Sequence, residues 1–319
     1  MESLELQISE VKPPKRMPSK RKQKDGECDL EKKRRRCIAF VRTRDAVEYH
    51  SKVEWHNLVK GCTIGQKPCG KKPPVFIRAS HFEVLKGPVS GYDKAFNTDC
   101  MTRLAREVLG LENCIPDVRV IVSSDGKIGL RSPMIGYPGP DSGERVVSNN
   151  DARGLCKLHE CTDDWMKVMV DPMDVLKIVV AKNIVGSSDN NTSNILIELH
   201  TGRVYGLDLG GQRKNALQMT VPSFQWAFSK KISLRVSQQM NDLINLYAVD
   251  MMGWLECLKR EDTKRQWQQV IAEYPTPVSV PDLCEGVDLF YNFFSERYAK
   301  IKRLPAVYRS EERRVGKEC

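Results

Sequence analysis

The stretch VVAKNIVGSSDNNTSNILIELHTGRVYGLDLGGQR, residues Val179–Arg213, decides the fold that this chain is expected to adopt. In it an apolar run gives way to the polar segment Asp189–Asn194, and two short apolar segments, Ile195–Leu199 and Arg203–Leu207, then lead to Asp208. Short polar side chains bond to the nearby backbone and favour turns. Because a glycine-containing loop separates the two apolar segments, the pattern predicts a β-hairpin that brings Asn194 next to Asp208.

The oxygen-bearing side chains around this hairpin indicate phosphate chemistry. Divalent cations that accompany phosphates take oxygen ligands, and an Asn and an Asp presented together suit Mg²⁺. We therefore predict Asn194 and Asp208 as metal ligands. A further carboxylate in the preceding loop can orient or deprotonate an attacking hydroxyl group, which makes Asp189 the predicted catalytic residue. The alternative that the residues alone leave open is an ordinary hairpin with solvated turn residues.

The same stretch resembles the catalytic and metal-binding loops of the protein-kinase-like superfamily, in its phosphatidylinositol-kinase-like branch of atypical kinases. Those loops read Asp-x-x-x-x-Asn and Asp-Phe-Gly; here they stand as Asp189-Asn190-Asn191-Thr192-Ser193-Asn194 and Asp208-Leu209-Gly210. Gly186 matches the glycine that precedes the catalytic Asp in that branch. Within the superfamily the chain most resembles the actin-fragmin kinase catalytic domain, through VFIRAS (75–80), TRLAREVLGL (102–111) and IPDVRVI (115–121).

This resemblance implies an α+β fold of the two-lobed protein-kinase-like type. A small lobe, 46–138, would hold an antiparallel sheet and one helix, and a mostly helical large lobe would span 139–308. In the small lobe the composition predicts a first strand at Val53–His56, a glycine-containing turn between two strands at Gly61–Lys72, and a strand at Val75–Ala79. A helix at Cys100–Leu109 and a hairpin formed by Val118–Val122 and Ile128–Leu130 complete it.

The large lobe is predicted to begin with the helix that delivers the chain to Asp189. Asp171-Pro172 has the pattern of an N-cap followed by proline at the first helical position, and apolar residues then recur at helical spacing up to Ile184. Beyond the quoted stretch, three segments have helical apolar spacing: Leu234–Leu258, Thr263–Glu273 and Pro281–Leu304.

The resemblance also implies a nucleotide site in the small lobe. The family has a lysine that holds the nucleotide phosphates on the strand where this chain has Arg78, and Asp99 is the candidate for the carboxylate that pairs with that cation. Lys86 and Lys94 are the alternatives if the strand register differs. The lobe connection Ser132–Pro138 would meet the adenine, and its predicted contacts are Met134, Ile135 and Gly136.

The function that the resemblance implies is ATP- and Mg²⁺-dependent phosphoryl transfer to a protein Ser or Thr, as in actin-fragmin kinases. A cytoskeletal protein would be the acceptor, with actin itself suggested only by the family. Two alternatives stay open. Because an arginine fork is not geometrically equivalent to an ammonium group, Arg78 is consistent with a pseudokinase that binds nucleotide or serves as a scaffold. A lipid or small-molecule kinase would carry the same catalytic loops.

Composition is consistent with a globular protein outside membranes. The chain has 319 residues, of which 40% are hydrophobic and 29% charged, enough for one large or two-lobed domain. We find no run of about 18 apolar residues and no apolar leader segment, so neither a membrane span nor a secretory signal is expected. The 11 cysteines follow no repeating framework and are expected to be reduced.

The two ends of the sequence differ from the part between them. Residues 1–45 are expected to form a disordered basic tail, since the clusters Lys20–Lys22 and Lys32–Arg36 dominate it. The clusters resemble a bipartite nuclear import signal, so a cytoplasmic or nuclear location or both is expected, and nucleic acid would be touched only weakly, through this tail. Arg309–Cys319, RSEERRVGKEC, resembles a translated sequencing adapter and is excluded from the fold.

Overall fold

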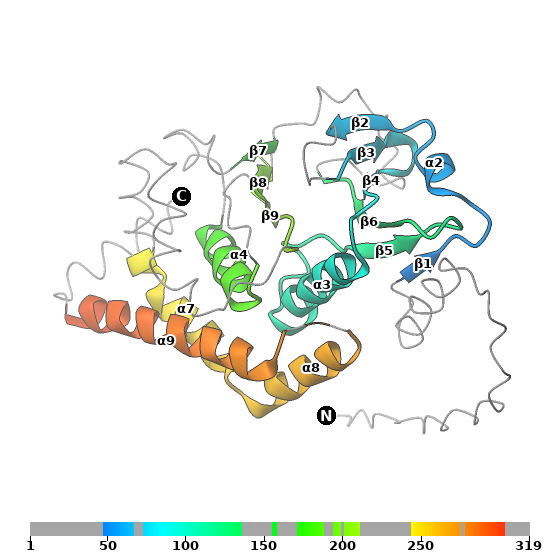
Figure 1. The fold of residues 1–319 in the computed structure, drawn as a ribbon. Coiled ribbons are helices and arrows are strands. Elements are labelled where there is room, and N and C mark those ends of the chain that lie inside the picture. Colours follow the sequence, from blue (N-terminus) through cyan, green and yellow to red (C-terminus); the bar gives the residue numbers. More distant parts are fainter. Residues whose placement is uncertain are drawn as a thin grey trace, which may run out of the picture.

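The computed structural model describes residues 47–66, 73–135, 155–157, 171–187, 194–198, 201–210, 244–274, 276 and 278–303. These residues form a mixed α+β structure with a six-stranded sheet, a three-stranded sheet and helices packed beside them (Figure 1). Among them, no helix is long and apolar enough to cross a membrane. The predicted basic tail, the adapter-like terminus, Asp189 and Gly136 lie outside the described residues.

The larger sheet has the strand order β1-β5-β6-β4-β3-β2. Its strands are β1 Val47–Tyr49, β2 Thr63–Gln66, β3 Val75–Arg78, β4 Glu83–Lys86, β5 Arg119–Val122 and β6 Ile128–Pro133. Neighbouring strands are antiparallel except β1 and β5, which are parallel. A short 3-10 turn, η1 (Ala79–His81), joins β3 to β4.

The sequence predicted part of this sheet. The strand β3 and the β5–β6 hairpin are confirmed. The glycine-containing turn was predicted over Gly61–Lys72, but Thr63–Gln66 of that range form the strand β2, which pairs with β3. The prediction of a first strand at Val53–His56 is wrong. That segment leads into the short helix α2 (Trp55–Leu58), because the backbone amide of Trp55 donates to Asp125 Oδ1 at 3.0 Å and turns the chain across the β5–β6 loop.

The helix of the first half is longer than predicted. It runs as α3 (Tyr92–Arg103) and continues as a π-helical turn, η2 (Leu104–Val108), before Gly110 reverses the chain at φ +71°. The predicted range Cys100–Leu109 therefore covers the second half of this helix, and the first half, from Tyr92, was missed. The missed part buries Asn97, Thr98 and Asp99 next to the apolar Ala95 and Phe96, so its buried residues show no regular hydrophobic period.

The smaller sheet carries the hairpin predicted from the quoted stretch. It has the order β7-β8-β9, with β7 Leu155–Lys157, β8 Ile195–Glu198 and β9 Val204–Gly206, all antiparallel. The preceding helix α4 (Pro172–Ile184) begins as predicted, since Asp171 Oδ1 accepts a hydrogen bond from the Met173 amide at 2.8 Å. The almost fully buried side chains of α4 hold it in the main hydrophobic cluster.

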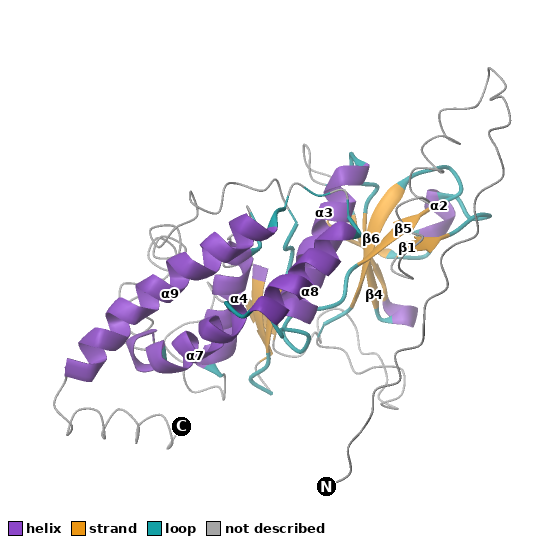
Figure 2. Cartoon of the chain, turned by 90° about the horizontal axis from the view of Figure 1, so that it is seen from below, coloured by secondary structure: helices purple, strands orange, loops and turns teal. Residues whose placement is uncertain are grey.

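Three helices at the C-terminal side confirm the predicted helical segments in their described parts: α7 Ala248–Leu258, α8 Glu261–Ala272 and α9 Val280–Arg303. Helix α9 packs against α7, α4 and α8, while α8 lies beside α3 and η2 (Figure 2). The main cluster joins these helices to α4, β8 and β9, and a second cluster lies between α3 and the larger sheet. Tyr274 packs against both clusters.

Candidate active site

The β8–β9 hairpin places Asn194 and Asp208 at its open end. Asn194 directly precedes β8, and Asp208 follows β9 by two residues. The amide of Leu207 donates to the carbonyl oxygen of Asn194 at 2.7 Å, which continues the strand pairing to the two predicted metal ligands. At the other end Gly202 closes the hairpin at φ +71°, and its amide donates to the Glu198 carbonyl at 2.8 Å.

The Asn194 side chain presents a polar atom without a partner. Its Nδ2 is buried and has no hydrogen-bond partner among the described residues. A buried unpaired amide group costs free energy, about 1 to 3 kcal/mol, unless a ligand satisfies it. Because the nitrogen and oxygen of an amide exchange by a flip of the side chain, the same position can present the carbonyl oxygen that a cation needs.

Asp208 has an unusual backbone conformation and a cationic partner. Its φ is +49°, in the left-handed region that residues other than glycine seldom adopt, which turns the chain sharply after β9. Its Oδ2 lies 2.7 Å from Nζ of Lys86, the last residue of β4, although 122 residues separate them in the sequence. Both side chains are about one third exposed, at 28% for Lys86 and 36% for Asp208, so a ligand can reach the pair.

The residues on either side of Asp208 fix its backbone. The buried head group of Lys182, on α4, donates to the Leu207 carbonyl at 3.0 Å. Leu209 is buried in the main cluster. Gly210 lies so close to α3 that a Cβ atom on it would be 2.0 Å from Thr98 Oγ1. The segment from 207 to 210 is therefore held by α4, by the core and by α3.

Arg78, the predicted phosphate contact, has other partners. Its guanidinium is 3.5 Å from Glu83 Oε2 and donates to the Leu58 carbonyl, in a network where Glu83 also pairs with Arg131 at 3.1 Å. The contact to Asp208 comes instead from Lys86, the alternative that a different register allowed. The signal for Lys86 was the short apolar run ending before Gly87-Pro88, a turn that stops β4 and leaves Lys86 at its end.

The remaining predicted residues occupy separate places. Asp99 lies within α3, is 2% exposed and accepts a hydrogen bond from the Tyr274 hydroxyl at 2.8 Å. Met134 and Ile135 follow β6 and are half-buried, and the Met134 amide already donates to the Phe82 carbonyl at 2.7 Å. The Met134 amide is therefore already paired within the protein.

The donor set suits a magnesium ion bound together with phosphate. Mg²⁺ binds to proteins through one or two oxygen ligands and takes the rest of its six from water and phosphates. One carboxylate and one amide fit that description, and the described residues contain no cluster of three or more His, Cys, Asp or Glu that would build a metal cage. The ammonium group of Lys86 lies beside the Asp208 carboxylate, and a cation in this position can neutralise phosphate charge.

The similarity of this chain to known proteins adds little to this geometry. No family model matches the chain, and no curated protein matches it. Among solved structures, the chain is similar to the crystal structure of the Helicobacter pylori proinflammatory kinase CtkA, at 9% identity and a TM-score of 0.36, over 80% of this chain and 96% of that one. A likeness at this level carries no argument about function, so the functional conclusion depends on the arrangement of Lys86, Asn194 and Asp208.

Proposed function

We propose that the chain is an ATP- and Mg²⁺-dependent phosphotransferase with a two-lobed protein-kinase-like fold. The observation that carries the proposal is the ion pair between Lys86 and Asp208, which joins the end of β4 to the end of the β8–β9 hairpin. The resemblance of Asp189–Asn194 and Asp208–Gly210 to kinase loops supports it. In such a fold the strand cation and the metal carboxylate face the same nucleotide from two sides.

Each residue has a stated role in this proposal. Asp208 and Asn194 hold Mg²⁺, which neutralises phosphate charge when it is bound. Lys86, in place of Arg78, contacts the phosphates as a compact ammonium group. Asp189 orients or deprotonates the acceptor hydroxyl group, and the backbone after β6, at Met134 to Gly136, meets the adenine.

The left-handed turn at Asp208 gives the site its preorganisation. A backbone held by Lys182, Leu209 and Thr98 keeps the carboxylate in place before the nucleotide arrives, so less ordering is needed on binding. The Lys86 contact holds the same carboxylate in the unliganded protein. Asp208 would hold the metal when it is bound, and Lys86 would then contact the phosphates.

We propose a protein Ser or Thr as the acceptor, by resemblance to the actin-fragmin kinases, with actin and other cytoskeletal proteins as the first substrates to try. A lipid or small molecule is the other acceptor class. The basic tail is proposed to direct part of the protein to the nucleus. Deleting residues 1–40 in a fluorescent fusion should abolish nuclear enrichment, and an unchanged distribution would contradict that role.

The deciding experiment is transfer of radiolabel from ATP to actin, to a protein mixture, to the chain itself and to lipid vesicles, with and without Mg²⁺. Asp208→Asn should abolish label transfer. The matched control is Asp288→Asn, because Asp288 forms an ion pair of the same length, 2.7 Å, with Lys259 on the surface between α7 and α9. Equal transfer by wild type and Asp208→Asn would exclude the proposed site.

A pseudokinase is the second candidate, and one observation favours it. Asp99, the helix carboxylate expected to support the phosphate-binding cation, is hydrogen-bonded to Tyr274. A protein of this kind would still bind nucleotide at Lys86 and Asp208 but would not turn it over. Thermal stabilisation by ATP and Mg²⁺ without any label transfer would identify the pseudokinase.

A further inference from the structure

Helix α3 is fastened along one side to the connection between α8 and α9. We call its residues Glu273, Tyr274 and Thr276 the α8–α9 clamp. Helix and clamp run in opposite directions, so that residues later in one meet residues earlier in the other. Polar contacts join them: Arg103 with Glu273 and with Tyr274, Asp99 with Tyr274 at 2.8 Å, and Asn97 with Thr276 at 2.9 Å.

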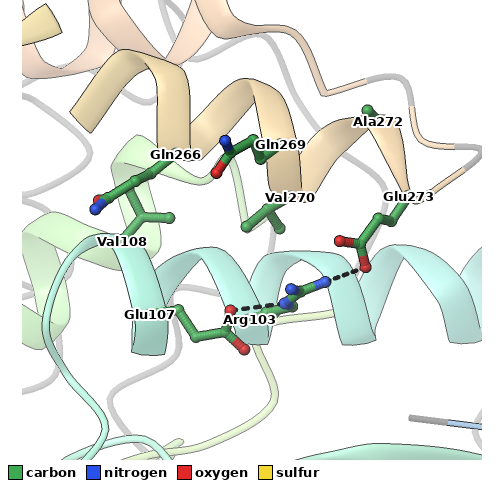
Figure 3. A pocket seen from close by; sticks show the side chains of 8 residues that line it. All are labelled: Arg103, Glu107, Val108, Gln266, Gln269, Val270, Ala272 and Glu273. Atoms are coloured by element: carbon green, nitrogen blue, oxygen red, sulfur yellow. Dashed lines mark hydrogen bonds and ion pairs between the residues drawn. The ribbon is translucent and has the colours of Figure 1, made fainter. Parts of the chain in front are cut away.

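The outer contact of the clamp is partly buried, since the side chains of Arg103 and Glu273 are 16% and 25% exposed. Arg103 bonds to Glu273 and also to Glu107 at 2.7 Å, and it lines a pocket of about 580 Å³ between η2 and α8, whose other walls include Val108 and Val270 (Figure 3). Water in the pocket screens this ion pair only in part. The Arg103 contact therefore also helps to hold α3.

The middle contact is better protected. Asp99 is 2% exposed, so its hydrogen bond from the Tyr274 hydroxyl is shielded from water. The Tyr274 ring packs against the main cluster and against the cluster between α3 and the larger sheet. A shielded hydrogen bond to a carboxyl group is stronger than an exposed one. Since the Tyr274 side chain also hydrogen-bonds to Arg103, its hydroxyl group takes part in both the middle and the outer contact.

Thr98, the neighbour of Asp99 on α3, connects the clamp to the candidate active site. Thr98 is 4% exposed, and its Oγ1 donates to the Lys94 carbonyl at 2.8 Å, which fixes the side chain. The backbone of Gly210 lies directly against that side chain. A movement of α3 would consequently displace Gly210, and Asp208 lies two residues away on the same segment.

We propose that Tyr274 is a positioning residue for the magnesium-binding segment. By holding Asp99 it fixes α3, and α3 fixes Gly210 and Asp208 through Thr98. This inference rests on the proposed function for its effect on magnesium, although the physical coupling from Tyr274 to Gly210 does not. The clamp would let the C-terminal helices set the position of α3.

The variant Tyr274→Phe tests the proposal, because it removes the hydroxyl group and keeps the ring in both clusters. ATP binding is measured by calorimetry over a series of Mg²⁺ concentrations. The Mg²⁺ concentration for half-maximal binding should rise about threefold to tenfold, the range that loss of one buried hydrogen bond allows. Binding of ATP without metal should be unchanged, which a general loss of folding would not produce. The control is Tyr298→Phe on α9.

Amide hydrogen exchange gives a readout that needs no nucleotide. Leu209 and Gly210 should exchange several-fold faster in Tyr274→Phe than in wild type. With Tyr274 intact, Asp99→Asn keeps an acceptor oxygen for the hydroxyl group and should retain near wild-type exchange and Mg²⁺ dependence, whereas Asp99→Ala should lose both. Unchanged exchange at Leu209 and Gly210 in a folded Tyr274→Phe protein overturns the inference. Wild type that shows no Mg²⁺-dependent ATP binding overturns the proposed function, and the exchange data still decide the clamp.

Discussion

Replacing Lys86 by Met should change the stability of this protein little and reduce its phosphoryl transfer strongly. The variant loses an ion pair whose two side chains are about one third exposed. Pairs of this kind contribute about 0.2 to 1 kcal/mol, because water and salt screen them. For a chain of this length the melting temperature should fall by less than about 4 °C.

The expected effect on phosphoryl transfer is much larger. A charged group aimed at the transferred phosphate contributes about 3 to 4 kcal/mol to the transition state, which corresponds to a loss of about 100-fold to 1,000-fold in kcat. Arg78→Met should show the opposite balance. It breaks the contact to Glu83 and leaves the Leu58 carbonyl without its donor, at a cost of about 1 to 2 kcal/mol of stability, while label transfer changes little.

Urea unfolding and label transfer from ATP, measured on the same preparations, check both variants. Lys259→Met is the matched control, since Lys259 also forms a 2.7 Å pair with an aspartate and lies outside the candidate site. If Arg78→Met lost activity and Lys86→Met kept it, the phosphate contact would be on β3 and the reasoning from the Asp208 ion pair would be refuted.

Three further changes have defined outcomes. Asn194→Ala removes an amide nitrogen that has no partner among the described residues, so stability without ligand should not fall, while thermal stabilisation by Mg²⁺ and ATP should disappear. Gly210→Ala forces a methyl group into Thr98 and should cost about 1 to 3 kcal/mol in urea unfolding, of which Thr98→Ala in the same chain should recover a part. Burial acts to raise the pKa of Asp125, but hydrogen bonds from Ser123 and two further donors lower it to about 2. The contribution of the Asp125 carboxylate to the free energy of unfolding should therefore be complete above pH 4 and be lost as the pH falls towards 2. Stability curves of Asp125→Asn and wild type should thus converge in that window, from a difference of about 1 kcal/mol at neutral pH.

Local signals in the sequence were enough to predict the β8–β9 hairpin and the helix α4 before it. The Asp171-Pro172 cap and the glycines at 126 and 202 act within a few residues, so their structure follows from the sequence at that point. The pairing of Asn194 with the end of β9 follows in the same way, since a short loop determines the register of a hairpin.

Features that depend on distant parts of the chain could not be predicted. The strands VFIR and EVLK each end in a cation, and only the position of β4 between β3 and β6 brings Lys86, rather than Arg78, to Asp208. The start of α3 was missed because Asn97 and Asp99 face the clamp, and polar partners from the far end of the chain replace the apolar pattern. The hydrophobic periodicity of a sequence indicates residues that are buried among apolar groups, and it does not indicate polar groups that are buried in pairs.

The parallel strand β1 has a consequence for handling the protein. It lies at the edge of the larger sheet and covers β5, whose residues Val120, Ile121 and Val122 are at most 1% exposed. A shortened chain that starts after Tyr49 would turn β5 into an edge strand, with free amide and carbonyl groups beside three apolar side chains. Such edges recruit strands from other molecules. Trimming the N-terminus should therefore leave a soluble protein only up to Val47, and aggregation should begin as soon as β1 is lost.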